Sequence, residues 1–100
     1  MKTGIELIAE ERERQIKEEG WTPEHDDFHK NEELANAAVA YAIPDNRQII
    51  KREIWPFACG WFKPNTYPRN KAGRIRELVK AGALIAAEID RLSREIEKEK

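Results

Sequence analysis

The sequence predicts an all-α protein, a small helical bundle with a long C-terminal helix and a loop rich in aromatic residues and proline. Apolar residues recur at alternating steps of three and four through the last third of the chain, which is typical of an amphipathic helix. Helix-start signals stand near the N-terminus, and no alternating run of β-branched residues indicates a strand. The 100 residues suffice for one domain, residues 1–100, with a modest core.

The first helix is predicted from Thr3 to Glu19. Thr3 and Glu6 fit a capping box, and Gly20 can adopt the left-handed conformation that ends a helix. Its apolar face comprises Ile5, Ile8, Ala9 and Ile16. Arg12 falls on the same face. There its charge must pair with a carboxylate, reach solvent at the edge of the face, or bind a ligand.

A second start signal, Thr22 followed by Pro23, predicts a short helical turn. Asn31 is the expected N-cap of the next helix, which ends at Ile43 because Pro44 disfavours helical backbone before it. The expected inner face of that helix comprises Leu34, Ala35, Ala38, Tyr41 and Ala42.

Residues 45–70 read as irregular chain, with one short helix expected over 47–54 and prolines among the aromatic residues. The last helix is predicted over about 70–98. Its apolar seam comprises Ile75, Leu78, Gly82, Ile85, Ile89, Leu92 and Ile96. We expect this seam to bury against partner helices, and the length of the rod to supply the contact of a homodimer or larger homo-oligomer. Gly82 is explained either by packing or by the close approach of another backbone or a ligand.

Composition excludes several partners. With 18 basic and 19 acidic residues and a net charge of −1, the chain lacks the basic field that binds duplex nucleic acid. No apolar run is long enough to span a bilayer, so no membrane partner is expected. The single cysteine excludes an intrachain disulfide, and the N-terminus has no signal-peptide pattern. We therefore expect a cytoplasmic protein.

The turn after the first helix carries an unusual density of functional side chains, which permits three interpretations. His25 and His29 stand at i, i+4 and could bind a metal ion with Asp26, although the pattern lacks a zincin glutamate. The acidic residues could instead cap helices, with the aromatic residues in the core. In the third interpretation, imidazoles and carboxylates hold ribose hydroxyls, indoles stack on a base and cations meet phosphate. The candidate ligand-binding residues are Arg12, Trp21, His25, Asp26, Asp27, Tyr41, Trp61, Lys63 and Arg74.

Catalytic chemistry finds little support in the sequence. Helical nucleotide pyrophosphatases hold magnesium through carboxylates three residues apart on two helices. Here Glu33 is followed three residues later by Asn36, and Glu77 by Lys80, which does not bind metal. Neither Cys59 nor Ser93 has a recognisable base partner. No catalytic residue and no cofactor are therefore expected.

Two resemblances bear on function. The stretch from Arg14 to Lys30, with Gly-Trp at 20–21 and Asp-Asp at 26–27, resembles the ryanodine-receptor-type (RyR) repeat, whose later Pro-Tyr segment has no match here. The whole chain resembles a group of small phage and prophage proteins. They share a Gly-Trp-Thr-Pro-Glu-His-Asp-Asp block, a Trp-Pro…Trp-x-Lys-Pro block and a Leu-Val-Lys-Ala-Gly-Ala-Leu-Ile helix. Here these blocks are residues 20–27, 55–64 and 78–85.

RyR-type modules of bacteria and phages are associated with nucleotide-derived signals, so the resemblance implies a non-catalytic nucleotide binder. We therefore expect a phage-encoded protein that sequesters a cyclic or ADP-ribose-like signalling nucleotide in the host cytoplasm. Trp21 and Trp61 would stack on a base, and Arg12 and Lys63 would meet phosphate. The alternatives are a metal-dependent nucleotide hydrolase and a helical module that binds a host protein.

Overall fold

The computed structural model describes residues 1–44, 53–57 and 68–99. In chain order the helices are α1 (Gly4–Glu18), α2 (Pro23–Asp27), α3 (Glu33–Ala42) and α5 (Lys71–Glu99). No strand occurs among these described residues. The predicted all-α class and the long C-terminal helix are confirmed.

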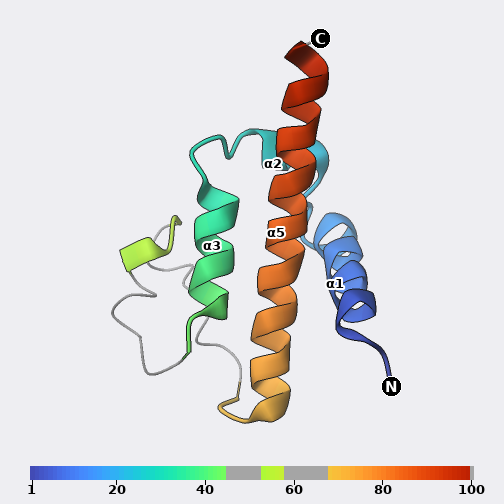
Figure 1. Cartoon of the computed structure of the whole chain (residues 1–100), viewed down its shortest axis with the longest axis vertical. Coiled ribbons are helices and arrows are strands. Elements are labelled where there is room, and N and C mark those ends of the chain that lie inside the picture. Colours follow the sequence, from blue (N-terminus) through green and yellow to red (C-terminus); the bar gives the residue numbers. More distant parts are fainter. Residues whose placement is uncertain (45–52, 58–67, 100) are drawn as a thin grey trace.

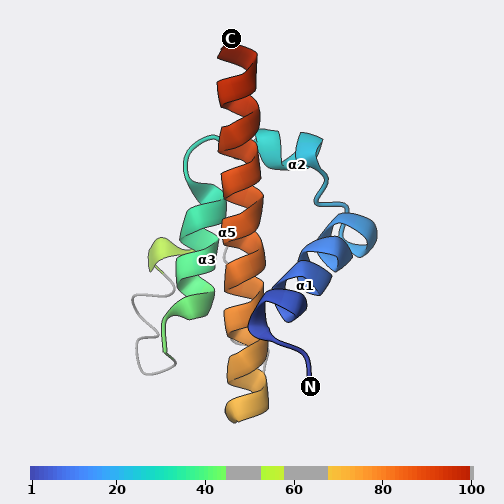
Figure 2. The same ribbon diagram turned by 45° about the vertical axis from the view of Figure 1, so that its right-hand side comes forward.

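Helix α5 is the axis of the molecule (Figures 1 and 2). Its 29 residues correspond to about 43 Å of helix, close to the longest dimension of 45 Å. Helix α3 lies along one side of α5, α1 crosses the other side obliquely, and α2 lies across the half of α5 nearer the C-terminus (Figures 1 and 2). The last turns of α5 extend beyond the other helices.

The core lies between α3 and α5 and is built from small side chains. Its buried residues are Leu34, Ala37, Ala38, Tyr41, Ala81, Leu84 and Ala87. Facing alanines let the two helices approach closely, while the leucines and the tyrosine fill the remaining volume. Trp21, Trp55 and Phe57 pack against this cluster from its edges.

Most predicted helix ends are confirmed. The Thr3 hydroxyl accepts a hydrogen bond from the amide of Glu6, whose carboxylate accepts one from the amide of Thr3, which completes the capping box. Thr22 caps α2, and Gly20 has a left-handed φ of 73°. The predicted Asn31 cap is wrong: Glu32, with φ 66°, is the N-cap of α3 and makes no side-chain cap bond.

The junction between α3 and α5 depends on polar contacts. The Arg74 guanidinium donates hydrogen bonds to the carbonyl oxygens of Tyr41 (3.3 Å), Ala42 and Ile43 (3.4 Å). These are carbonyls at the end of α3 that lack a partner within the helix, so Arg74 caps it from α5. The Asn70 side chain accepts a hydrogen bond from the amide of Gly73 at 2.8 Å and caps the start of α5.

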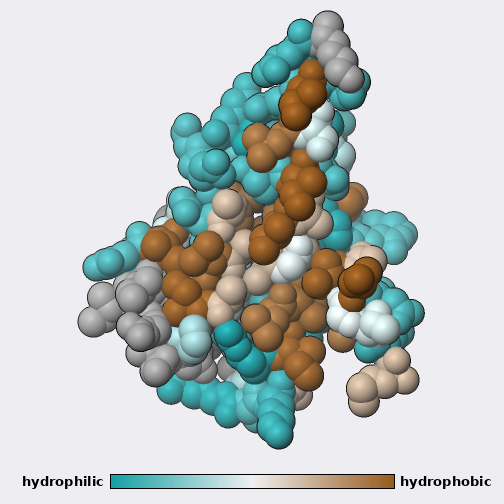
Figure 3. All heavy atoms as spheres, viewed as in Figure 1, coloured by the Kyte–Doolittle hydropathy of each residue, from teal (hydrophilic) through white to brown (hydrophobic). Residues whose placement is uncertain are grey.

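The expected burial of the α5 seam within the chain is wrong. The seam side chains are about half exposed, for example Ile75 at 50 % and Ile89 at 58 %. The opposite face of α5 is buried instead, because its alanines fit against α3 and its charged residues are ion-paired. Figure 3 shows the result as a hydrophobic stripe along the outer surface of α5.

The expected inner face of α1 also needs correction. Ile5 is 83 % exposed, whereas the buried residues of α1 are the polar Glu11 and Gln15. Helix α1 is therefore attached to α5 mainly through charged groups. Ile8 contacts α5 at Gly82, where an added Cβ would lie 2.5 Å from the Ile8 Cδ1 atom. Gly82 thus serves close packing by α1.

None of the helices within the described ranges has the length and apolarity of a membrane span. Most of the short helix predicted over 47–54 lies outside the described residues, as do Trp61 and Lys63.

We predict that Gly73→Ala destabilises the protein. An added Cβ would lie 1.8 Å from the Pro68 carbonyl oxygen, so the turn that enters α5 must move. We expect the free energy of unfolding in urea to fall by about 1–3 kcal/mol. The control is Gly4→Ala, whose Cβ meets nothing within 4 Å and which should be neutral or stabilising. Equal stability of the two variants would contradict this account of the turn.

Candidate functional site

Two of the predicted ligand-binding residues are bound to each other. Arg12 Nη2 lies 2.5 Å from Asp26 Oδ2, and Arg12 also donates to the carbonyl oxygen of Trp21 at 3.3 Å. The Asp26 side chain is fully enclosed, and that of Arg12 is 12 % exposed. This pair connects α1 to α2. A ligand could reach the Asp26 carboxylate only if the pair opened.

The rings beside this ion pair remain partly accessible. Trp21 and His25 are stacked, with an interplanar angle of 3° and centroids 6.1 Å apart. His25 Nδ1 lies 3.3 Å from Asp26 Oδ1, which orients the imidazole, and the His25 side chain is 39 % exposed. A ligand could therefore contact this stacked pair without rearrangement.

The stacked pair begins a continuous series of aromatic contacts. His25 meets His29 edge to face at 4.9 Å, and His29 meets Phe57 at 5.5 Å. The series continues through Trp55 to Tyr41, which is buried in the core. Sequence reasoning missed Phe57, because nothing in the spacing indicates that residues 53–57 return to α2. These aromatic contacts hold residues 53–57 against the end of α2.

Metal coordination finds no support in the described part of the chain. No group of three or more His, Cys, Asp or Glu side chains there is placed to hold an ion. His29 Nδ1 faces Glu33 Oε2 at 3.4 Å, whereas His25 faces Asp26, so the two imidazoles have separate carboxylate partners. The described residues therefore give no support to the alternative metal site of His25, His29 and Asp26, or to a hydrolase that would use it.

Asp27 lies apart from its neighbour Asp26. Its carboxylate accepts hydrogen bonds from Arg94 of α5 at 2.8 and 3.2 Å, and Lys98 lies at 3.9 Å. The hydrogen bonds from Arg94 hold the pKa of Asp27 below its ordinary value. Asp27 therefore fastens α2 to the C-terminal half of α5.

A buried charge cluster around Glu11 was not foreseen from the sequence. The Glu11 carboxylate accepts hydrogen bonds from Arg14 at 2.7 and 2.9 Å and from Arg76 of α5 at 3.0 Å, and Lys80 lies at 3.9 Å. Burial raises the pKa of Glu11 and is the largest single effect. The hydrogen bonds from Arg14 and Arg76, together with the charges of Arg14 and Lys80, outweigh it, so the pKa lies below the ordinary value of 4.5. The cluster holds α1 on α5.

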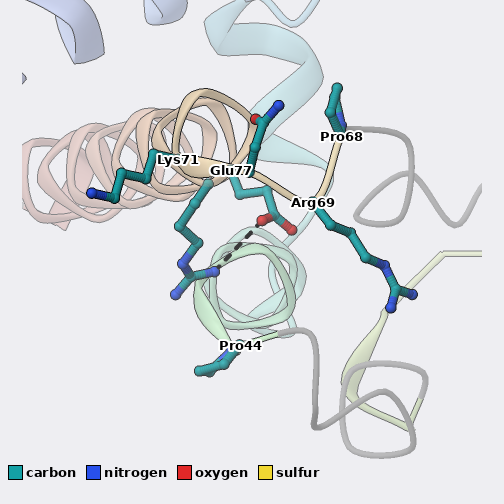
Figure 4. A pocket seen from close by; sticks show the side chains of 7 residues that line it. Pro44, Pro68, Arg69, Lys71 and Glu77 are labelled. Atoms are coloured by element: carbon teal, nitrogen blue, oxygen red, sulfur yellow. Dashed lines mark ion pairs between the residues drawn. The ribbon is translucent and has the colours of Figure 1, made fainter.

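A second candidate site is a basic hollow of about 260 Å³ beside the start of α5 (Figure 4). It is lined by Pro44, Pro68, Arg69, Asn70, Lys71, Arg74 and Glu77. Arg74 Nη1 lies 3.7 Å from Glu77 Oε1 within the hollow. The first turn of α5 has no acidic residue, so positive side chains and the positive end of the helix dipole coincide here.

The predicted ligand-binding residues thus divide between two places. Arg12, Trp21, His25 and Asp26 lie at α2, near one end of the bundle, and Arg74 lies at the opposite end, where α5 begins (Figure 1). Tyr41, 1 % exposed, belongs to the core. The sequence did not indicate this separation, because it depends on how the helices are arranged in space.

Comparison of the chain with protein-family models, with curated proteins and with solved structures finds no match.

We predict that Asp26→Ala lowers the free energy of unfolding by about 3–5 kcal/mol, because it leaves the Arg12 guanidinium without its buried carboxylate. Replacing both partners, as Arg12→Met with Asp26→Leu, should recover most of the loss. The control is Glu13→Ala, which removes the exposed pair with Lys17 at 2.6 Å and should cost less than about 1 kcal/mol. A similar small effect of Asp26→Ala in chemical denaturation would refute the structural role of the pair.

The pKa of Glu11 predicts a pH dependence of stability. Since folding lowers this pKa, the stabilisation is present above the unfolded value of 4.5 and is lost as the pH falls through the folded value. Glu11→Gln should therefore be less stable than wild type near neutral pH, and the difference should shrink in acid. Melting temperatures between about pH 7 and pH 3 measure this. Glu24→Gln, an exposed control, should follow wild type; an unchanged gap for Glu11→Gln would contradict the assignment.

Proposed function

We propose that the protein captures a phosphate-bearing nucleotide, of the cyclic or ADP-ribose-like class, and holds it without hydrolysis. The observation that carries the proposal is the basic hollow at the start of α5. There Arg69, Lys71 and Arg74 line a hollow beside the N-terminus of a 29-residue helix, with Arg69 and Lys71 extending to opposite sides (Figure 4). Phosphate is the anion that helix N-termini and arginine side chains commonly bind.

The charges of the hollow favour an anionic ligand. Three of its seven lining residues are cations, and its one carboxylate, on Glu77, lies close to Arg74. Arg74 is already held by the carbonyl oxygens at the end of α3, so its position is fixed before a ligand arrives. A cation that is preorganised in this way loses little conformational entropy when phosphate binds.

The volume of the hollow suits a phosphate with an attached sugar better than a whole dinucleotide, since pockets for drug-sized ligands measure about 300–1,000 Å³. The base would then extend beyond the hollow. Trp61 and Lys63 precede Pro68 by seven and five residues, so extended chain could carry them at most about 25 Å and 18 Å from it. Their proposed roles, stacking on the base and binding phosphate, stay predictions.

Retention without turnover is supported by the chemistry of the lining. Hydrolysis of a phosphate ester needs a metal ion or a base that activates water. Among the described residues that line the hollow, Glu77 is the one carboxylate, and it is paired with Arg74 at 3.7 Å. Together with the resemblance to phage proteins, this supports a protein that withdraws a host signalling nucleotide from solution.

Isothermal titration with ATP, ADP-ribose and a cyclic dinucleotide tests the proposal. We expect at least one of these probes to bind, and the double variant Arg69→Glu with Lys71→Glu to weaken binding by on the order of 100-fold. The matched control is Lys17→Glu with Lys30→Glu, which reverses two exposed charges outside the hollow and should bind as wild type does. Mass spectrometry should recover the probe intact. Equal affinity of the two double variants, absence of binding, or conversion of the probe would each contradict the proposal.

A further inference from the structure

The outer face of α5 carries a hydrophobic stripe that no element of the described chain covers. It comprises six exposed residues, Ile75, Leu78, Ile85, Ile89, Leu92 and Ile96. Their exposed fractions run from 42 % at Leu92 to 58 % at Ile89 and Ile96. From Ile75 to Ile96, 21 residue steps along the helix, the stripe measures about 32 Å, and Figure 3 shows it running along α5 on one face of the molecule.

The spacing of the stripe is that of a helix that pairs with another helix. With Gly82 included, the intervals from Ile75 to Ile96 are three and four residues in strict alternation. This heptad pattern keeps apolar side chains on a single seam facing a partner helix, whereas scattered surface residues follow no such period. Contiguous exposed apolar patches of this kind are rare on proteins that act as monomers.

We propose that the stripe binds the same stripe of a second copy of this chain, and that the two α5 helices run antiparallel. A second copy supplies a partner surface of the required period and length, because a two-fold axis makes one patch its own complement. The direction of pairing follows from two features of α5, its end charges and its projecting end.

The charges at the two ends of the stripe select the antiparallel direction. The repeat continues to Lys71, four residues before Ile75, and to Glu99, three residues after Ile96, and both are exposed. A parallel pair would bring Lys71 next to the partner's Lys71 and the two glutamates next to each other. An antiparallel pair places Lys71 of one helix beside Glu99 of the other, and it also opposes the two helix dipoles.

Gly82 does not contribute to the choice of direction. Ile8 of α1 lies against it, so the space beside the glycine is filled within the chain. The six exposed aliphatic residues on either side of Gly82 carry the pairing.

The arrangement of the helices leaves room for this pairing. The contacts of α1 and α3 with α5 described above fall between Arg74 and Ala87, whereas the last turns of α5 extend past α2 (Figures 1 and 2). Val39 of α3 and Ile5 of α1 are also exposed, at 47 % and 83 %. The projecting end of one α5 would thus lie along the half of the partner's α5 that α1 and α3 flank.

Sedimentation equilibrium tests whether the second copy is the occupant. We expect wild-type protein to form a reversible dimer, and Ile89→Glu to raise the dissociation constant by on the order of 100-fold, because two carboxylates would be buried in each dimer. Ala72→Glu, which adds one carboxylate to α5 at an exposed position outside the stripe, should dimerise as wild type does. Circular dichroism confirms folding, and Ile96→Glu, in the projecting end, repeats the test where the core cannot be disturbed.

Spin labels determine the direction. In a Cys59→Ser background, a label at Ala72→Cys should give an intermolecular distance of about 35–45 Å in the antiparallel dimer and less than about 20 Å in a parallel one. A short distance would overturn the antiparallel arrangement. Wild-type protein that stays monomeric, or a dimer that tolerates both Ile89→Glu and Ile96→Glu, would overturn the proposal and leave the stripe to a partner of another kind. Nucleotide titration of the same variants separates this outcome from the behaviour of the basic hollow.

Discussion

The structure depends on the packing of α3 against the alanine face of α5. Ala37 and Ala38 face Ala81 and Ala87 in one buried cluster, and such small side chains allow the helices a close approach. The same choice of residues leaves this face of α5 with little apolar area to bury. Helices α1 and α2 are consequently held largely by charged groups, through the Glu11 cluster and through the pairs of Arg12 with Asp26 and Arg94 with Asp27.

Because much of the interior is occupied by alanines and ion pairs, most of the large aliphatic side chains of α5 remain outside, whereas Val79 and Leu84 are buried. Covering a half-exposed Ile or Leu contributes on the order of 1 kcal/mol. The basic hollow lies at the start of α5, beside Lys71, which belongs both to its lining and to the extended repeat, so ligand binding and association share one helix end.

The sequence predicted local features well, since capping boxes, a Thr-Pro start and a glycine stop act within a few residues. The period of α5 also located its apolar seam, but period alone cannot tell whether a seam faces its own chain or another. Burial of Glu11 was not predictable, because a carboxylate is buried only when cations converge on it, and here Arg76 and Lys80 come from the far end of the chain. For the same reason the sequence offered Asp26 as a ligand-binding residue, although Arg12 occupies its carboxylate. Trp61 and Lys63 stay predictions.

Amide hydrogen exchange in the last turns of α5 tests most directly whether the stripe is an interface. In a single copy the turns around Ile96 lie past the pair of Arg94 with Asp27 of α2, extend beyond the bundle and should open easily. If a second copy covers them, their protection should rise with protein concentration while that of the core around Leu84 stays constant. Protection that is low and independent of concentration throughout residues 92–97 would contradict the account.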